Sequence, residues 1–373
     1  MLNLKKMKKT LLVFSRGRYV KKNNDLYYYD NDGELIQSLE DSFDKIIVFG
    51  RLVNSSNDEY ESASKYQFRF KDSVDSVTYS KEKPTSFIVF LLKLFFCGLL
   101  SRKILIFGPS LSALFVNFLF FYKYTVYYSG IDWNKSGKLW SLFEKISTNS
   151  ATRIICTGNH LKDKFTNYGN KFVELVKPPL KIKCKDPNKI KTLCKEKNFN
   201  ILSVGAFSKR KNQILLLKAI PILTKRFPNI LIRFCGFGDL NEFKKNNDQI
   251  IKSVEKNIIF EGHVASNYIL GDFYNSADVV VITSKEEGVP RALYESISYG
   301  TPVISTALPG VKGFFGDHGI YVDFDNENDL AEQIIQLLTS RKYYNAMSRK
   351  VKQLYLNFFD ESTKEMFLRV MNV

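Results

Sequence analysis

Cysteine and histidine are both scarce in this sequence of 373 residues, which has five cysteines and three histidines. The cysteines are scattered and form no CxxC pair, which argues against a disulfide framework and against a structural zinc site. A reducing, cytoplasmic compartment is therefore expected. The few histidines also leave little material for acid–base catalysis by imidazole.

The sequence also lacks an apolar run of about twenty residues, the length that a transmembrane helix needs. Its two most apolar stretches, 86–100 and 111–121, are shorter, and Lys93 interrupts the first. They are expected to be core helices, with an interfacial membrane surface or a membrane span as alternatives. The cations expected to rim such a membrane surface are Arg102, Lys103 and Lys123. The basic N-terminus has only a short apolar run and no small-residue cleavage site, so it predicts a first strand and no signal peptide.

Acidic residues are outnumbered: 38 Asp and Glu stand against 55 Lys and Arg, a net charge of +17. Such a balance favours an anionic partner, which could be a nucleotide, a lipid phosphate, a membrane surface or a nucleic acid. A nucleic-acid-binding protein should show a known binding motif or a basic stripe, whereas the lysines here are scattered. An apolar content of 45% is ample for two cores, and the length suits two domains.

The second half of the sequence alternates strand and helix patterns. Strands are expected at 200–207, 230–236, 257–262, 278–284 and 302–306, and helices at 212–227, 239–254, 266–276, 290–299 and 326–339. This alternation predicts a parallel, doubly wound sheet.

The first half is less regular. Strands are expected at 10–14, 45–49, 103–107, 124–128 and 152–156. Residues 26–37, LYYYDNDGELIQ, are expected to form a hairpin that turns on the Asn-Asp-Gly sequence.

The most informative stretch is 284–310, SKEEGVPRALYESISYGTPVISTALPG. Glu287 and Glu295 stand eight positions apart in it, on either side of Pro290, which can open a helix. The N–H groups that begin this helix, at 291–293, are expected to favour an anion. Ionised carboxylates only accept hydrogen bonds, so beside an anion site they suit the hydroxyls of a sugar phosphate.

This stretch resembles the donor-binding signature of family-4 glycosyltransferases, in which two glutamates flank seven residues in an EGxPRxLxE-type run. The matching residues are Glu287, Gly288, Pro290, Arg291, Leu293, Glu295, Gly300, Pro302, Val303, Ile304 and Gly310. The resemblance implies an α/β protein of the GT-B fold, with two Rossmann-like doubly wound domains facing a central cleft. It also implies a retaining glycosyltransferase, of hexosyl or related type, that uses a nucleotide-sugar.

The segment LSVGAFSKRKN is similar to the VGRLxxxKG segment of the same family. Gly205 and Lys211 match, and the resemblance gives Lys211 a contact to the donor diphosphate. Ala206 stands where the family has an arginine, so Arg210 or Lys209 is expected to supply that charge.

A Gly-Phe-Gly turn at 236–238 resembles the GxG turn of the family, and the strand that follows it ends where relatives place the nucleotide base. The residues carried over as donor-binding are Gly205, Arg210, Lys211, Gly262, His263, Val264, Glu287, Gly288, Val289, Pro290, Arg291 and Glu295. Glu287 and Lys211 are the expected catalytic residues. Glu287 is assigned to the sugar hydroxyls, and Glu295 to the ribose hydroxyls.

The acceptor side departs from the family pattern. Relatives often carry a histidine after the fourth strand, and Ser129 and Asp132 are the side chains expected in that region here. Gly313 stands where relatives often carry a glutamate. No metal or other cofactor is expected, because the family works without a bound metal and the Asp-x-Asp pairs of this sequence suit turns.

We expect an acceptor-binding domain over 1–178, a nucleotide-sugar-binding domain over 179–355, and a C-terminal helix within 356–373 that packs back on the first domain. The expected acceptor is a lipid-linked saccharide in the assembly of a bacterial surface polysaccharide such as capsule or O-antigen. The protein is then expected at the inner face of the membrane, in peripheral contact with anionic lipid and without a nucleic-acid partner. The alternatives are another GT-B enzyme, such as a sugar-nucleotide epimerase, and a basic nucleic-acid-binding protein.

Overall fold

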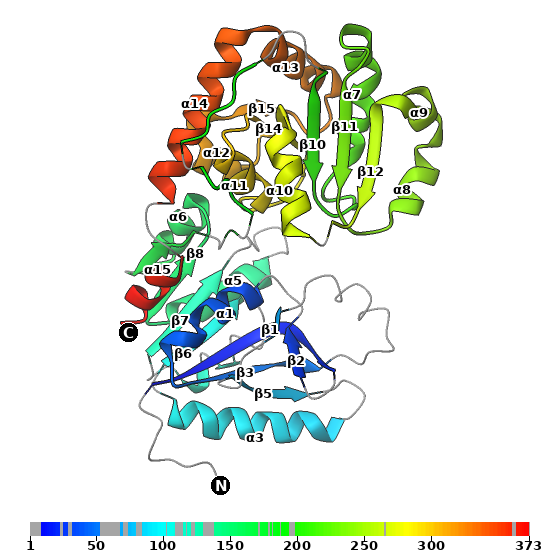
Figure 1. Ribbon diagram of the computed structural model, residues 1–373. Coiled ribbons are helices and arrows are strands. Elements are labelled where there is room, and N and C mark those ends of the chain that lie inside the picture. Colours follow the sequence, from blue (N-terminus) through cyan, green and yellow to red (C-terminus); the bar gives the residue numbers. More distant parts are fainter. Residues whose placement is uncertain are drawn as a thin grey trace. The chain divides into compact units, whose positions relative to one another are not determined.

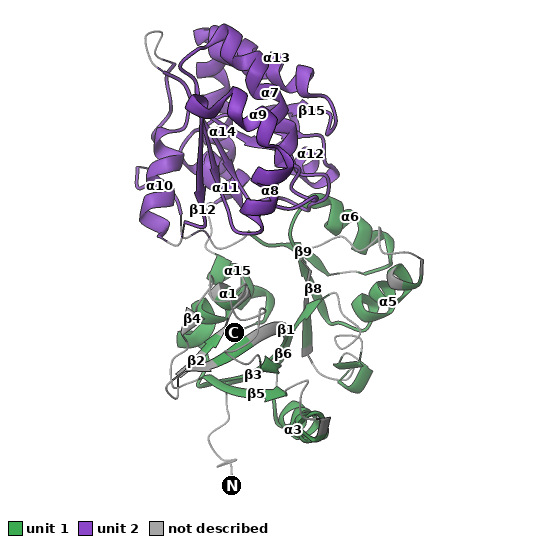
Figure 2. Cartoon of the chain, turned by 90° about the vertical axis from the view of Figure 1, so that its right-hand side faces the viewer, with its two compact units in different colours: residues 1–179, 361–373 green, residues 180–360 purple. Residues whose placement is uncertain are grey.

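The computed structural model divides the chain into two compact units (Figure 2). The residues that it describes are 9–22, 25–28, 32–52, 68–69, 74–79, 84–101, 103–108, 115–116, 118–120, 124–129, 138–170, 172–177, 180, 182–186, 188–193, 198–264, 266–359 and 363–372. Unit 1 comprises 1–179 and 361–373, and unit 2 comprises 180–360. The first division thus lies one residue after the expected one. The boundary expected after residue 355 needs correction, because it falls inside helix α14 (Arg341–Phe358).

Unit 1 is built on a mostly parallel sheet (Figure 1). Its strands are β1 (Thr10–Lys22), β2 (Asp25–Tyr28), β3 (Lys45–Leu52), β4 (Phe68–Arg69), β5 (Val74–Tyr79), β6 (Lys103–Gly108), β7 (Tyr124–Ser129), β8 (Arg153–Cys156) and β9 (Val173–Leu175). The parallel pairs follow the order β5-β3-β1-β6-β7-β8-β9. Strand β2 joins the far end of β1 in antiparallel pairing, and β4 pairs with β2. The five strands predicted in this half are confirmed, and β2, β4, β5 and β9 add to them.

The hairpin predicted over residues 26–37 is wrong in its second half. Strand β2 pairs with the end of β1, so the chain reverses between β1 and β2. Residues Asp32–Leu39 form helix α1. This helix buries Leu35, Ile36 and Leu39 on one face, and that one-sided burial outweighs the local turn signal of Asn-Asp-Gly.

Helices cover both faces of the unit 1 sheet (Figure 2). They are α1, α3 (Pro84–Leu100), α5 (Lys138–Asn149), α6 (Asn159–Asn167) and α15 (Thr363–Val370). Side chains of β1 alternate between the two layers: Leu11 and Val13 pack with α1 and α15, whereas Leu12 and Phe14 pack with α3 and α6. None of the helices that the structure describes is long and apolar enough to cross a membrane.

The C-terminal helix α15 belongs to unit 1. Phe367 is fully buried in the cluster that α1 forms with the sheet. Lys103 Nζ donates to the carbonyl oxygens of Met371 and Asn372, at the end of the described chain. Lys103 therefore binds the last turn after α15, and its place in the expected membrane rim stays a prediction. Arg102 and Lys123, the other two cations of that rim, lie outside the described residues.

Unit 2 contains a parallel sheet with the strand order β12-β11-β10-β13-β14-β15. Its strands are β10 (Asn200–Val204), β11 (Leu231–Cys235), β12 (Ile258–Gly262), β13 (Val279–Ile282), β14 (Val303–Thr306) and β15 (Ile320–Val322). Five of them stand where the sequence predicted them. Strand β15 has only three residues, too few for alternation to be recognised.

Helices also flank this second sheet. They are α7 (Gln213–Arg226), α8 (Leu240–Asn246), α9 (Asp248–Ser253), α10 (Asn267–Ser276), α11 (Arg291–Ser298), α12 (Pro309–Phe315), α13 (Glu327–Thr339) and α14. The single helix predicted over 239–254 is two helices, because Asn247 ends α8 with a non-helical backbone and its Nδ2 donates to Phe243 O at 2.8 Å.

The strand order of unit 2 reverses direction between β10 and β13. The chain runs outward through β11 and β12, returns to place β13 beside β10, and then runs outward on the other side. Ligands of open α/β sheets bind beyond the carboxyl ends of the strands at such a switch point. The loops that follow β10 and β13 are therefore the first place to look for a site.

Candidate functional site

The loops after β10 and β13 contact each other at the switch point. Lys285 N donates to Arg210 O at 2.8 Å, and Thr283 Oγ1 donates to Lys211 O at 2.9 Å. The two strands are direct neighbours in the sheet, so both loops leave the same edge. The structure thus brings together the lysine segment and the first glutamate of the motif, which are 76 residues apart in sequence.

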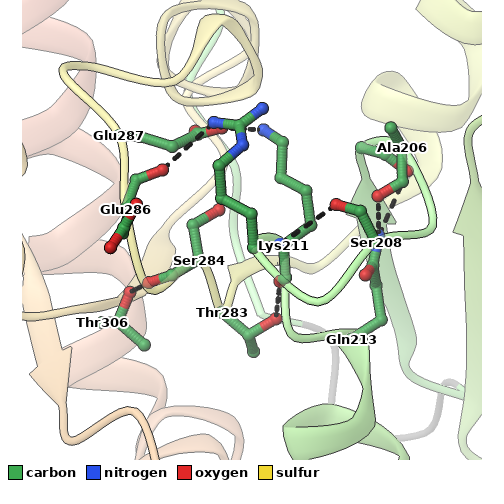
Figure 3. Close-up of polar contacts among 11 residues, drawn as sticks. Ala206, Ser208, Lys211, Gln213, Thr283, Ser284, Glu286, Glu287 and Thr306 are labelled. Carbon is green, nitrogen blue, oxygen red and sulfur yellow. Dashed lines mark hydrogen bonds and ion pairs between the residues drawn. The ribbon is translucent and has the colours of Figure 1, made fainter. Parts of the chain in front are cut away.

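Glu287 lies at the centre of this contact (Figure 3). Its Oε1 accepts a hydrogen bond from Arg210 Nη1 at 2.9 Å and forms an ion pair with Lys211 Nζ. The side chain of Glu287 is only 8% exposed, against 17% for Lys211 and 53% for Arg210. Its other oxygen, Oε2, is buried and has no hydrogen-bond partner among the described residues. A nearly buried carboxylate with an unused acceptor can receive a hydrogen bond from a ligand.

The structure distinguishes the two cations expected to replace the arginine missing at Ala206. Arg210 reaches Glu287, and it also donates to the carbonyl oxygen of Glu286 at 3.1 Å. Lys209 is exposed and forms no ion pair in the described part of the chain. Together Arg210 and Lys211 place two positive charges against one carboxylate, which leaves this cluster with a net positive charge.

The backbone around Lys211 explains the neighbouring residue types. The alkyl chain of Lys211 lies against Gly205, where an added Cβ would sit 3.4 Å from Lys211 Cδ. Asn212 follows in the left-handed region, with φ 52° and ψ 38°, which asparagine tolerates better than most residues. The amide of Asn212 is buried and donates to Phe324 O at 2.8 Å, which fixes the turn into α7.

The Gly-Phe-Gly turn and the end of β12 join the same edge. A Cβ on Gly236 would come within 1.8 Å of Gly205 O, so only glycine fits this crossing. Gly236 N donates to Gly262 O at 2.7 Å, and the ring of His263 packs edge-on against Phe237 with centroids 6.4 Å apart. Val264 packs against the hydrophobic core of unit 2. The segments assigned to the nucleotide base therefore adjoin the loop that carries Lys211.

Helix α11 begins one residue later than predicted. Pro290 is the residue before the helix, with an extended ψ of 137°, and Arg291 is the first helical residue. Leu293 N donates to Pro290 O at 3.0 Å, so one of the three N–H groups predicted to face an anion already has a partner. In the loop before the helix, Gly288 is half-buried and Val289 packs against the core.

Glu295 lies inside α11, beside a residue that the sequence motifs did not reveal. The hydroxyl of Tyr274, on α10, donates to Glu295 Oε2 at 2.7 Å within the core. Arg291 Nε is 3.9 Å from Glu295 Oε1, so the predicted i, i+4 pair is present but long. Burial, with the charge of Glu295, raises the pKa of Tyr274 well above its usual value, so its hydroxyl stays a donor. The only sequence signal for Tyr274 is its place in the helix predicted at 266–276.

The structure describes the expected acceptor-side residues only in part. Ser129 is the last residue of β7, but its side chain is outside the described set. Asp132 lies outside the described residues altogether. Across the part of the chain that is described, no three His, Cys, Asp or Glu side chains are grouped so that they could hold a metal ion.

Residues 185–354 match the family model described as Glycosyl transferases group 1. The match covers most of unit 2 and slightly less than half of the chain. The Lys211 loop and both glutamates of the motif lie within the matched residues, as do all of the donor-binding residues predicted above.

Two curated relatives each match a little less than half of the chain. An uncharacterised glycosyltransferase of Haemophilus influenzae is 26% identical over 161 residues, 42% of this chain and 44% of its own length. The GalNAc-α-(1→4)-GalNAc-α-(1→3)-diNAcBac-PP-undecaprenol α-1,4-N-acetyl-D-galactosaminyltransferase of Campylobacter jejuni is 28% identical over 180 residues, 47% of this chain and 48% of its own. The chain spans about half the length of the curated relatives that it matches.

The similarity in fold extends beyond residues 185–354. The crystal structure of Anabaena HepE in complex with UDP-glucose matches with a TM-score of 0.69 over 98% of both chains, at 14% sequence identity. A sucrose-phosphate synthase of Thermosynechococcus elongatus matches with a TM-score of 0.68, also over 98% of both chains and at 14% identity. These similarities confirm the predicted fold class, α/β of the GT-B type with two Rossmann-like units.

Proposed function

We propose that the chain is a glycosyltransferase that moves a sugar from a nucleotide-sugar to an acceptor hydroxyl. The observation that carries this proposal is the Glu287 cluster, in which a nearly buried carboxylate with an unused acceptor oxygen lies between two cations at the switch point. The cations suit a diphosphate, and the carboxylate suits the hydroxyls of the sugar beside it. The match of the residues around the cluster to the Glycosyl transferases group 1 model supports the same reaction.

In the proposed reaction the leaving group is a nucleoside diphosphate. Negative charge develops on it as the bond to the anomeric carbon breaks, and Lys211 with Arg210 stabilises that charge. Glu287 holds sugar hydroxyls and so fixes the orientation of the anomeric carbon. Attack by the acceptor from the same face, with retention of configuration, is part of the proposal, as is a hexosyl or related donor.

Transfer is expected to persist in the presence of a strong chelator. Two side-chain cations lie at the proposed diphosphate site, so charge stabilisation there does not require a metal ion. The measurement is the rate of nucleoside diphosphate release before and after treatment with EDTA and desalting. Complete loss of activity, restored by Mg²⁺ or Mn²⁺, would contradict this part of the proposal.

The ribose hydroxyls are proposed to bind Glu295, which makes Tyr274 a positioning residue. Tyr274→Phe removes the 2.7 Å hydrogen bond to Glu295 Oε2, and a hydrogen bond to a charged group is worth about 1.5–3 kcal/mol. We expect the Kd of a nucleoside diphosphate, measured by calorimetry, to rise about tenfold or more, whereas the Kd of inorganic pyrophosphate, which has no ribose, stays unchanged.

Tyr299→Phe is the matched control for that variant, because Tyr299 stacks on Tyr274 with parallel rings 6.0 Å apart and forms no hydrogen bond to Glu295. It should leave both dissociation constants unchanged. If Tyr274→Phe instead binds pyrophosphate and nucleoside diphosphate with an equal loss of affinity, the variant has lost structure generally, and the proposed ribose contact is contradicted.

For the acceptor we propose a lipid-linked saccharide at the inner face of a bacterial membrane. The name of the Campylobacter relative includes an undecaprenol-linked saccharide, which supports this class of acceptor. The surrounding process would be the assembly of a surface polysaccharide such as capsule or O-antigen, with the protein bound peripherally to anionic lipid. Ser129 and Asp132 are the side chains proposed for the acceptor side.

The proposed reaction is tested by incubating the full chain with a panel of UDP-, GDP- and ADP-sugars and a lipid extract as acceptor. Release of the nucleoside diphosphate should require both the matching donor and the extract. Failure of every donor to release its nucleoside diphosphate, with protein that is folded by circular dichroism, would contradict the reaction.

A further inference from the structure

Helix α3 packs on unit 1 through one side, where Leu91 and Cys97 are partly buried and the ring of Phe87 lies 5.2 Å from that of Tyr79. Phe90 and Leu94 are buried against the sheet, and Gly98 completes a stripe at the same spacing of four residues. The ring of Phe120 lies so close to Gly98 that an added Cβ would clash with it. This spacing keeps one side of the helix on the core and turns the rest of its circumference outward.

The outward side of α3 is apolar, which is unusual for a helix on a protein surface. It exposes large side chains that include Phe87, Ile88, Leu92, Phe95 and Phe96, and Ile88 and Phe96 are 61% and 60% exposed. A soluble surface rarely carries such a contiguous apolar patch without a partner that covers it.

Other segments of unit 1 also expose large apolar side chains. Phe118, between β6 and β7, is 75% exposed, and Val116 and Phe120 on either side of it are buried in the same cluster as α3. Helix α5 exposes Leu139, Leu142 and Ile146 at helical spacing. We call the exposed side of α3, Phe115, Phe118 and these three residues of α5 the outer apolar layer.

The topology places these segments on one side of the sheet. The crossovers from β5 to β6 and onward through β7, β8 and β9 all step in the same direction. Right-handed crossovers in one direction lie on one face. Figure 2 shows α3, α5 and α6 on one side of the unit 1 sheet and α1 and α15 on the other. The segments of the outer apolar layer therefore lie on one side of the sheet.

The exposed charges on the described parts of α3 and α5 within this layer are of one sign. Lys93 is exposed in the middle of α3, which has no acidic residue, and Lys145 is exposed on α5. The one acidic residue of α5, Glu144, is buried and pairs with Lys164 at 2.5 Å. Two copies of the chain joined through this layer would bring like charges together, whereas an anionic lipid surface would complement them.

The dimensions of α3 favour a position in the plane of a bilayer surface. Its 17 residues span about 25 Å, shorter than the hydrocarbon core of about 30 Å. A helix with apolar residues around most of its circumference and one lysine in the middle suits the boundary between headgroups and acyl chains.

We propose that the outer apolar layer of unit 1 docks on an anionic lipid bilayer, with α3 and α5 in its headgroup region and Lys93 and Lys145 facing lipid phosphates. This inference deepens the proposed function, on which it rests for the presence of a lipid-linked acceptor. It assigns membrane contact to α3 and α5, and it adds these two lysines to the cationic rim.

Co-sedimentation of the full chain with vesicles tests the docking. We expect binding to vesicles made of equal parts phosphatidylglycerol and phosphatidylcholine at low salt, and weaker binding to pure phosphatidylcholine. High salt should release part of the bound protein, because it screens the lysines but leaves apolar contact intact. Lys93→Glu with Lys145→Glu should abolish the preference for phosphatidylglycerol.

The apolar contribution is tested with Ile88→Ser, Leu92→Ser and Phe96→Ser combined, which alters only exposed positions of α3. Its partition onto the anionic vesicles should fall about tenfold or more. The matched control combines Tyr268→Ser, Ile269→Ser and Phe324→Ser, which removes three exposed apolar side chains from unit 2 and should leave partition unchanged. Leu139→Ser with Leu142→Ser on α5 is a second, independent variant should the first fail to fold.

Three results would overturn the docking. The first is that the wild type does not sediment with anionic vesicles at low salt. The second is that the α3 variant and the control variant sediment equally. The third is that the wild type forms a reversible dimer, which is lost in the α3 variant, and does not bind vesicles. Binding of nucleoside diphosphates, measured in parallel without lipid, separates this inference from the proposed function. A variant that loses vesicles but keeps nucleotide has lost the membrane contact alone.

Discussion

Replacing Glu287 with glutamine is expected to lower kcat about ten- to hundredfold, whereas the free nucleoside diphosphate binds equally well or more tightly. A neutral amide holds sugar hydroxyls less strongly than a carboxylate. Contacts of this kind are worth about 1.5–3 kcal/mol, and each 1.4 kcal/mol is tenfold in rate. The same change removes the shared partner of Lys211 and Arg210, so both cations act more fully on the phosphates.

Glu286→Gln is the matched control for this prediction. Glu286 is the adjacent residue and is exposed, and it contacts Arg210 through its backbone carbonyl, which the substitution keeps. Steady-state kinetics and calorimetry with the nucleoside diphosphate should find Glu286→Gln close to the wild type. Full activity of Glu287→Gln would remove Glu287 from the reaction.

Replacing Lys211 with alanine is expected to weaken both binding and turnover, in contrast to Glu287→Gln. The ammonium is lost from the proposed diphosphate site, at a cost of about 1.5–3 kcal/mol in the transition state, so kcat/KM should fall about ten- to hundredfold. The nucleoside diphosphate should also bind more weakly. Glu287 keeps only Arg210 as a partner, so the free energy of unfolding should fall as well.

Lys209→Ala is the matched control for Lys211→Ala. It removes the same charge from the same loop without removing a contact to Glu287. Lys209 lies in the same loop and carries the same charge, but it is exposed and pairs with no acidic residue among those described. It should leave kcat/KM and nucleotide affinity unchanged. Unchanged kcat/KM in Lys211→Ala, or equal losses in the two variants, would contradict the assigned role.

The fold of unit 2 could be predicted because its patterns are regular and local. Strands such as β13, fully buried on both faces, read as continuous apolar runs, and helices fill the gaps between them. Short elements escaped prediction, since three residues of β15 or seven of α12 carry too little periodicity. In unit 1, α1 was hidden by a turn sequence that tertiary burial overrides.

The candidate site was predictable where a motif repeats a family pattern, and not where residues meet only in space. Glu287 and Lys211 were named from sequence, and the neighbouring strands β10 and β13 bring them together. The contact of Arg210 with Glu287 depends on the path of one loop, which left Lys209 an equal alternative. Tyr274 meets Glu295 across two helices, and no spacing in the sequence records that contact.

Thermal unfolding with a panel of nucleotide-sugars tests whether unit 2 binds a nucleotide-sugar through the Glu287 cluster. At about 100 times its dissociation constant, the matching donor should stabilise the wild type by about 2.7 kcal/mol. Lys211→Ala at the same donor concentration should show much less stabilisation, and Lys209→Ala should match the wild type. Two results would contradict this binding site. One is that the donor stabilises Lys211→Ala as much as the wild type, and the other is that no nucleotide-sugar stabilises the wild type.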